Sequence, residues 1–168
     1  MKKVISVAFF ILFCQSLIYG AAIIPEDTKI ILKRGACYGQ CPIYMLTISV
    51  DGKVVYEGEN FVKVFGRQEK TISADKLRQL LEKFSEMDFP GLVEKAASLD
   101  CGTYTTDVPS TEISIVENGK ISSMIHNGKC YEDNLFKQLD ILAKVIDETV
   151  EVQDWISPPE FKEIKKKE

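Results

Sequence analysis

The stretch from residue 44 to 50 constrains the fold more than any other part of this chain. Its side chains alternate, with Tyr44, Leu46, Ile48 and Val50 separated by Met45, Thr47 and Ser49. A period of two predicts a half-buried β-strand. Asp51-Gly52 follows at once and predicts a turn into a second strand. If the loop is Val50-Asp51-Gly52, with Gly52 left-handed in a bulge, then Ile48 faces Val54 and Leu46 faces Tyr56. One surface of the hairpin then becomes apolar, so we predict the three-residue loop over a two-residue one.

Four further extended segments follow from similar patterns. A short β-like run lies within residues 28–34, and residues 61–72 predict another strand, with a bend at Gly66-Arg67. A second hairpin is predicted around Asn118-Gly119, from Ile113–Glu117 and Lys120–Ile125. A three-residue loop here also groups the apolar side chains on one face, namely Ile113, Ile115, Ile121 and Ile125.

Two segments have helical spacing. Ser73 is a good N-cap, and the residues after it place Leu77, Leu80, Leu81, Phe84 and Met87 on one face. We expect Pro90-Gly91 to end that helix. A second helix is predicted from about Asp133 to Val150, with an inner stripe of Leu135, Leu139, Leu142 and Ile146. Trp155 is expected to pack as a closing residue, because Pro158-Pro159 forbids further helix.

The order of these elements predicts the fold class. Both hairpins have an apolar face and both helices are amphipathic, so we predict an α+β fold in which an antiparallel sheet of hairpins carries two amphipathic helices on one face. The other face is expected to be open to solvent or to a partner. We assign residues 28–156 to a single α+β domain and residues 157–168 to a charged C-terminal tail.

The first 22 residues have the pattern of a secretory signal peptide. Lys2 and Lys3 precede an apolar run from Val4 to Phe13, and small residues near Ala22 supply cleavage positions. The competing interpretation is a retained membrane anchor over residues 4–24. Bulky Phe13 directly before Cys14 argues against a lipoprotein. The chain is therefore expected to be exported to the periplasm or the cell exterior, and to contact a membrane only if the leader is retained.

Removing the leader leaves an acidic chain with an even number of cysteines. Loss of Lys2 and Lys3 lowers the 21 basic residues to 19 against 25 acidic ones, which argues against a nucleic-acid partner. Of five cysteines, Cys37, Cys41, Cys101 and Cys130 remain. In an oxidising compartment these predict a disulfide framework. Three connectivities are possible, and loop closure favours Cys37–Cys41 with Cys101–Cys130.

The segment Cys37-Tyr38-Gly39-Gln40-Cys41-Pro42 allows two interpretations. As a structural disulfide its short loop contributes only ~2 kcal/mol, against ~3.6 kcal/mol for the Cys101–Cys130 loop. The alternative is a thiol redox or Cu(I) site, in which Cys37 and Cys41 supply soft thiolates and His126, the only histidine, completes the metal site. The structural disulfide is the favoured interpretation, and no cofactor is predicted.

Catalytic patterns are weak along the whole chain. His126 is the only possible imidazole base, and none of the serines near it lies in a nucleophile-elbow pattern. Asp107, in Thr106-Asp107-Val108-Pro109, is the most interesting acid, and its ordinary role would be a turn or cap that accepts backbone N–H bonds. A hydrolase that uses His126 or an acid pair is the third hypothesis. No catalytic residue is predicted.

Several of these motifs together resemble a known family. The segment from Cys37 to Tyr44, the Asp51-Gly52 turn, the strand Val55-Tyr56-Glu57-Gly58 and Thr106-Asp107-Val108-Pro109 resemble a family of bacterial secreted domains of unknown function. Its members look like C-x-G-x-C-P-x-Y followed by a D-G hairpin and a later T-D-x-P. The resemblance covers roughly residues 29–146. It implies an exported domain and no activity, so Tyr44, Asp107 and His126 are candidate functional residues only.

Taken together, the sequence favours a non-catalytic binding or cell-envelope interaction module. The expected partner is a protein or a small ligand of the envelope. The alternative from another class is the redox or Cu(I)-handling protein based on Cys37 and Cys41.

Overall fold

A six-stranded antiparallel sheet forms the centre of the protein in the computed structural model, which describes residues 24–100, 102, 104–130 and 133–156. The strands are β1 (Lys29–Arg34), β2 (Ile43–Ser49), β3 (Lys53–Asn60), β4 (Gly66–Thr71), β5 (Thr111–Glu117) and β6 (Lys120–His126). They lie in the order β4-β3-β2-β1-β5-β6. The predicted α+β class is confirmed.

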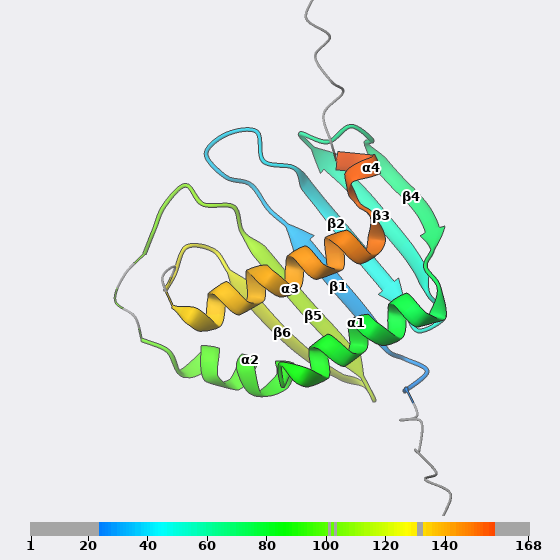
Figure 1. The fold of residues 1–168 in the computed structure, drawn as a ribbon. Coiled ribbons are helices and arrows are strands. Elements are labelled where there is room, and N and C mark those ends of the chain that lie inside the picture. Colours follow the sequence, from blue (N-terminus) through cyan, green and yellow to red (C-terminus); the bar gives the residue numbers. More distant parts are fainter. Residues whose placement is uncertain (1–23, 101, 103, 131–132, 157–168) are drawn as a thin grey trace, which may run out of the picture.

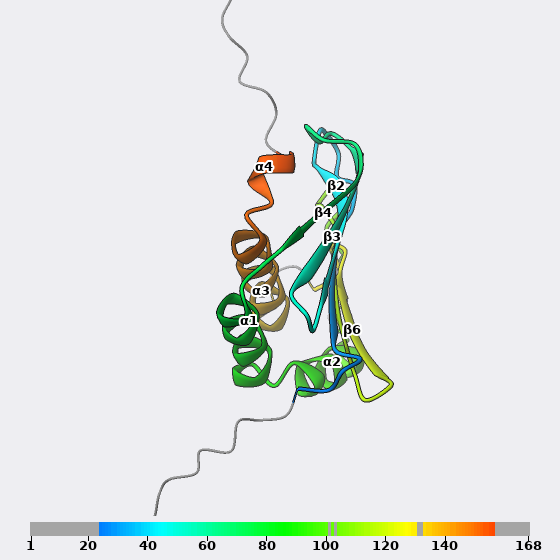
Figure 2. The ribbon, with the colours of Figure 1, turned by 90° about the vertical axis from the view of Figure 1, so that its right-hand side faces the viewer.

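Helices cover one face of this sheet and leave the other bare (Figure 1, Figure 2). They are α1 (Ala74–Glu86), α2 (Phe89–Ser98), α3 (Asn134–Val150) and the short α4 (Gln153–Ile156). The core lies between the two layers and is built from alternate strand residues, such as Leu32, Leu46 and Tyr56, packed against the apolar stripe of α3. Within the described ranges, no helix is long and apolar enough to cross a bilayer.

The first hairpin forms as its sequence pattern predicts. Ile48 pairs with Val54 and Leu46 with Tyr56, which is the register of the three-residue loop. Gly52 has a φ of 80°, and a Cβ placed on it would collide with the carbonyl oxygen of Ile72. A side chain is therefore excluded at this turn by both conformation and space.

The prediction for the second hairpin is wrong. Glu117 pairs with Lys120, so the loop has two residues, and Asn118 and Gly119 both have positive φ. Asn-Gly matches a type I′ turn, whose twist suits the flanking strands. The carboxylate of Asp27 accepts hydrogen bonds from both turn amides, at 2.9 and 2.6 Å. As a result Ile121 and Ile125 lie on the bare face, opposite to the buried Ile113 and Ile115.

Two of the four helices were not expected. The first predicted helix ends at Glu86, and Pro90, expected to stop it, instead lies in the first turn of α2. Proline is tolerated there because the first turn has no partner for its missing N–H. The Asp88 carboxylate caps the new helix by accepting a hydrogen bond from the Gly91 amide.

In the predicted 61–72 strand, only Gly66–Thr71 pairs with β3.

The bounds of α3 agree with the predicted helix from about Asp133 to Val150. Asp133 caps α3 through its carboxylate, which accepts from the Leu135 amide at 2.8 Å. Trp155, from α4, packs against Tyr56 with ring centroids 4.8 Å apart. The backbone carbonyl of Trp155 accepts a hydrogen bond from the Val64 amide, so α4 is fastened to the β3–β4 loop. The predicted leader (residues 1–22) and charged tail (residues 157–168) lie outside the described residues.

Candidate binding surface at one end of the sheet

One end of the sheet carries all the long loops. The described parts of four loops adjoin the sheet there, namely 35–42, 61–65, 104–110 and 127–130, because β1, β3 and β6 end and β2, β4 and β5 begin at that end. We call this region the loop end. At the opposite end, two of the connections are the tight hairpin turns near Gly52 and Asn118.

Exposed aromatic side chains gather on the loop end. Among the described residues, every strongly exposed aromatic side chain lies on one of these loops: Tyr38 (87% exposed), Phe65 (64%), Tyr104 (64%) and Phe61 (43%). Aromatic side chains in water are costly unless a partner covers them, and they are enriched at the centres of protein interfaces. Loops on a rigid sheet are the usual location of binding residues.

The first of these loops is closed by a disulfide. Cys37 and Cys41 are bonded, with their Cα atoms 5.8 Å apart. Inside the loop the Gly39 amide donates to the Cys37 carbonyl at 2.9 Å, and Tyr38 projects into solvent. This bond excludes the two crossed connectivities. Cys130 is also disulfide-bonded and is buried, whereas its expected partner Cys101 lies outside the described residues.

Two other loops of this end are joined by a backbone contact. Tyr104 pairs with Lys129 in an isolated antiparallel bridge, and the Thr105 amide donates to the Gly128 carbonyl at 2.9 Å. Gly128 has a φ of 96°, and a Cβ there would overlap the Thr105 carbonyl oxygen. The close approach of the two loops therefore requires glycine at this position.

Asp107 lies in the same region, on the loop that precedes β5. It is exposed, has a φ of 68°, and its carboxylate accepts a hydrogen bond from the Thr106 hydroxyl at 3.3 Å. Aspartate tolerates this left-handed conformation better than most residues. The geometry fits a turn residue, although among the described residues its carboxylate accepts from the neighbouring hydroxyl rather than from backbone N–H groups.

Tyr44 belongs to a polar network beneath the loop end, which we call the inner network. The Asp147 carboxylate on α3 accepts from the Tyr44 hydroxyl and from the Arg34 guanidinium, both at 2.7 Å. Arg34 also donates to the Thr111 hydroxyl at 2.9 Å. Arg34, Tyr44 and Thr111 lie at the ends of β1, β2 and β5, so the inner network ties α3 to the bases of the loops 35–42 and 104–110.

Burial sets the acid–base properties of the inner network. Desolvation raises the pKa of Asp147, against the opposing effects of the Arg34 charge and of the hydrogen bonds from Arg34 and Tyr44. Burial and the nearby Asp147 charge raise the pKa of Tyr44 above its usual range. For Arg34 the balance between the two effects is reversed. Burial lowers the pKa of its guanidinium, but the charge of Asp147 and the hydrogen bond to it, together with Tyr44, outweigh burial and raise that pKa. We take burial as the dominant effect on Asp147, because only 13% of its side chain is exposed.

A shallow pocket of about 270 Å³ opens beside this network. We call it the anchor pocket. Its lining comes from the ends of five strands and the loops next to them: Lys33, Arg34, Gly35, Ile43, Tyr44, Met45, Glu59, Ser110, Glu112 and Ile125. Lys33, Met45, Glu112 and Ile125 pair side by side across the strands, so most of the pocket lies on the bare face.

His126 lies in the core at the end of β6, where it contacts Asp140 and Phe136 of α3. Its side chain is almost fully buried, stacks on Phe136 with centroids 5.0 Å apart, and places Nδ1 3.1 Å from Asp140 Oδ2. No group of three His, Cys, Asp or Glu side chains in the described ranges is close enough to hold a metal ion, so His126 does not join Cys37 and Cys41 in a cluster. The redox interpretation of the cysteine pair stays a prediction.

Residues 28–150 match the protein family described as the domain of unknown function DUF6438, and the chain therefore belongs to that family. No curated protein matches the chain. The family assignment agrees with the sequence resemblance in that both point to a domain of unknown function, and it assigns no activity.

Sequence reasoning identified Tyr44 but missed its partners. Arg34 ends the first strand, and a charge there reads as an ordinary strand end. Asp147 had a usable signal, because it lies four residues after the buried Ala143 and eight after the buried Leu139, within the apolar stripe of α3. An acid at a core position indicates a buried partner. The exposed aromatic residues had no such signal, because only the topology brings their loops together.

Proposed function

We propose that this protein is a non-catalytic binding module of the cell envelope, and that the loop end of its sheet is the surface that binds a partner protein. The single observation that carries this proposal is the gathering of Tyr38, Phe61, Phe65 and Tyr104 on the loops of one end. Tyrosine and phenylalanine supply large contact areas with few rotatable bonds, so they bind at a low entropic cost.

The scaffold beneath these loops supports the proposal. The Cys37–Cys41 disulfide, the Tyr104–Lys129 bridge and the inner network each restrict one part of the loop end. Restricting a binding loop before association reduces the entropy lost on binding. A disulfide is also compatible with an oxidising compartment outside the cytoplasm.

Photo-crosslinking in cells tests the binding surface directly. p-Benzoyl-phenylalanine is placed at position 38, 65 or 104, one at a time, and at position 141 as the control. Ile141 is 61% exposed and lies on α3, so it matches Phe65 in exposure but not in location. We expect one crosslinked protein of the same mass from positions 38, 65 and 104, and none from position 141.

The proposal fails if positions 38, 65 and 104 give no crosslink, or if position 141 gives the same one. The cellular location is checked in the same cells. Fractionation should find the protein in the envelope or the medium, and its mass should show loss of the segment up to about residue 22. A full-length protein in the cytoplasm would contradict the envelope part of the proposal.

A further inference from the structure

The anchor pocket is at the small end of what a small-molecule site occupies. Its volume of about 270 Å³ lies just below the range of roughly 300–1,000 Å³ that such sites occupy. Its lining combines apolar side chains with charged ones at the rim. Interfaces between proteins use pockets of this kind to take up a single anchoring side chain.

The floor of the anchor pocket suits the aliphatic part of a long side chain. Ile43 and Met45 contribute apolar surface from β2, and Ile125 contributes from β6, where half of its side chain is exposed. Long charged side chains commonly lay their methylene groups on apolar surface while the charged head stays at the rim.

Most charges around the pocket are already compensated. Lys33 Nζ lies 3.2 Å from Glu112 Oε2, and the other oxygen of Glu112 accepts from the Ser123 hydroxyl. Arg34 is paired with Asp147 on the helix side of the sheet. These pairs leave one lining carboxylate without a counter-charge.

That carboxylate belongs to Glu59, near the end of β3. Glu59 is exposed, lines the anchor pocket, and forms no ion pair or hydrogen bond among the residues that the structure describes. Glu57, two residues earlier in β3 on the same face, does have a counter-charge, because it forms an ion pair with Arg67 at 3.5 Å. A cation entering the pocket would therefore find one uncompensated negative charge above an apolar floor.

We infer that the anchor pocket binds an arginine or lysine side chain of the partner protein, with its methylene groups on Ile43, Met45 and Ile125 and its cationic head at Glu59. This inference rests on the proposed function, because it names the side chain by which the partner is recognised. The pocket adjoins the loop end, because Gly35 of the loop 35–42 and Ser110 of the loop 104–110 belong to its lining.

A titration with minimal probes tests the inference. The exported form of the protein, with its disulfides intact, is followed by two-dimensional ¹⁵N–¹H NMR while N-acetyl-arginine methylamide is added. We expect the amide signals of Lys33, Ile43 and Glu112 to shift and to saturate. N-acetyl-glutamate methylamide should leave them in place. Methylguanidinium, which lacks the methylene groups, should bind more weakly than the arginine probe.

Substitution separates the pocket from general electrostatics. Glu59→Gln should weaken arginine binding about two- to fivefold, the range expected for an exposed ion pair. Glu94→Gln is the matched control, because Glu94 is also exposed, lies on α2 and has no ion pair among the described residues. It should leave binding unchanged.

Two binding results would overturn the inference, and so would a failure to bind. One is equal shifts with the glutamate probe, and the other is arginine binding that Glu59→Gln does not weaken. Absence of any arginine binding also overturns it, and if the crosslinks from positions 38 and 65 persist, the proposed function stands without it. Loss of those crosslinks removes the proposed function itself, whatever the titration shows.

Discussion

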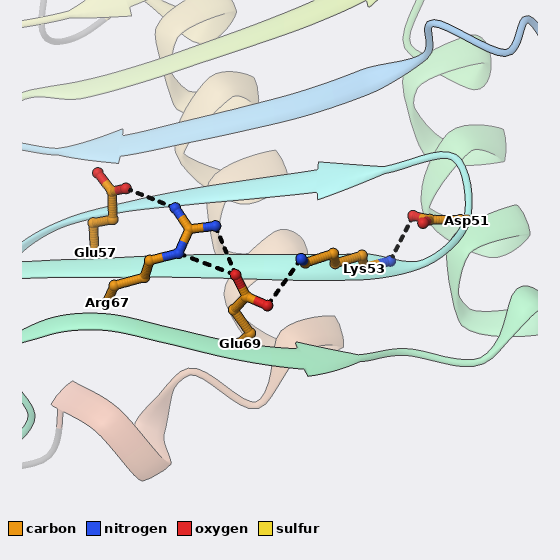
Figure 3. Close-up of polar contacts among 5 residues, drawn as sticks. All are labelled: Asp51, Lys53, Glu57, Arg67 and Glu69. Carbon is orange, nitrogen blue, oxygen red and sulfur yellow. Dashed lines mark hydrogen bonds and ion pairs between the residues drawn. The ribbon is translucent and has the colours of Figure 1, made fainter.

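Two charged networks lie on opposite faces of the same sheet, and they differ in how far their side chains are exposed to water. The inner network joins Arg34, Tyr44 and Asp147 between the sheet and α3. The Arg34 side chain is 22% exposed and the Asp147 side chain 13%. The outer network lies on the bare face of β3 and β4, where Arg67 contacts Glu57 and Glu69, and Glu69 contacts Lys53 (Figure 3). Its side chains are 43% to 57% exposed.

The difference in burial predicts a difference in consequence. Water screens the outer network and competes for its hydrogen bonds, so each pair contributes little. The inner network is largely cut off from water, so removal of one member leaves the others buried and uncompensated. The inner network also anchors the loop end, whereas the outer network covers an edge strand with charge, which discourages pairing with another sheet.

The largest effect is expected from Asp147→Ala. It leaves the Arg34 guanidinium buried without its counter-charge, and it removes the acceptor of the Tyr44 hydroxyl. We expect the free energy of unfolding to fall by about 3–5 kcal/mol. Urea denaturation of the exported form measures this. A loss below about 1 kcal/mol would mean that water reaches Arg34, and the contrast between the two networks would disappear.

A smaller effect is expected from Tyr44→Phe. The ring stays in the core beside Tyr56, but the 2.7 Å hydrogen bond to the Asp147 carboxylate is lost. A hydrogen bond to a charged group contributes about 1.5–3 kcal/mol, so we expect a loss in that range by urea denaturation. Tyr56→Phe is the matched control, because its hydroxyl donates to the Val64 carbonyl, which is uncharged, and its loss should be smaller.

The two networks also predict opposite responses to pH. Burial raises the pKa of Asp147, so between about 3.8 and its native pKa the folded state holds a proton that the unfolded state has released. The free energy of unfolding then falls as pH rises through that window. Hydrogen bonds from Lys53 and Arg67 lower the pKa of Glu69, so its contribution is present above about 4.5 and is lost as pH falls through the lowered pKa.

Comparison of the wild type with Asp147→Asn isolates the inner contribution. We expect the wild type to lose stability relative to this variant as pH rises above about 3.8, by about 1.4 kcal/mol for each unit of pKa shift. Urea denaturation at a series of pH values gives the difference. The opposite slope would show that Arg34 and Tyr44 outweigh burial and hold the Asp147 pKa below its usual range.

Local chemistry made much of the sheet predictable, and topology explains most of what was missed. The β2–β3 register followed from the requirement that Leu46 and Ile48 share an apolar face with Tyr56 and Val54. The same rule failed at Asn118-Gly119, because the preference of Asn-Gly for a type I′ turn, supported by Asp27, outweighed the cost of exposing Ile121 and Ile125. Of the candidate site residues, Tyr44 was identified by its motif. The partners of Tyr44 and the positions of the aromatic loops depend on which strands are neighbours in the sheet. Short sequence patterns do not predict that strand order.

The smallest effect is expected from Arg67→Ala, which removes the centre of the outer network. Arg67 loses its contacts with Glu57 and Glu69, but all three side chains already reach water. We expect a loss of only about 0–1 kcal/mol, and less at high salt, because the Debye length shortens from about 10 Å at 0.1 M to about 3 Å at 1 M. Urea denaturation at both salt concentrations checks this, and the Tyr44→Phe loss should change little between them. A large, salt-insensitive loss for Arg67→Ala would mean that something covers the bare face, so that the outer network is buried as the inner one is.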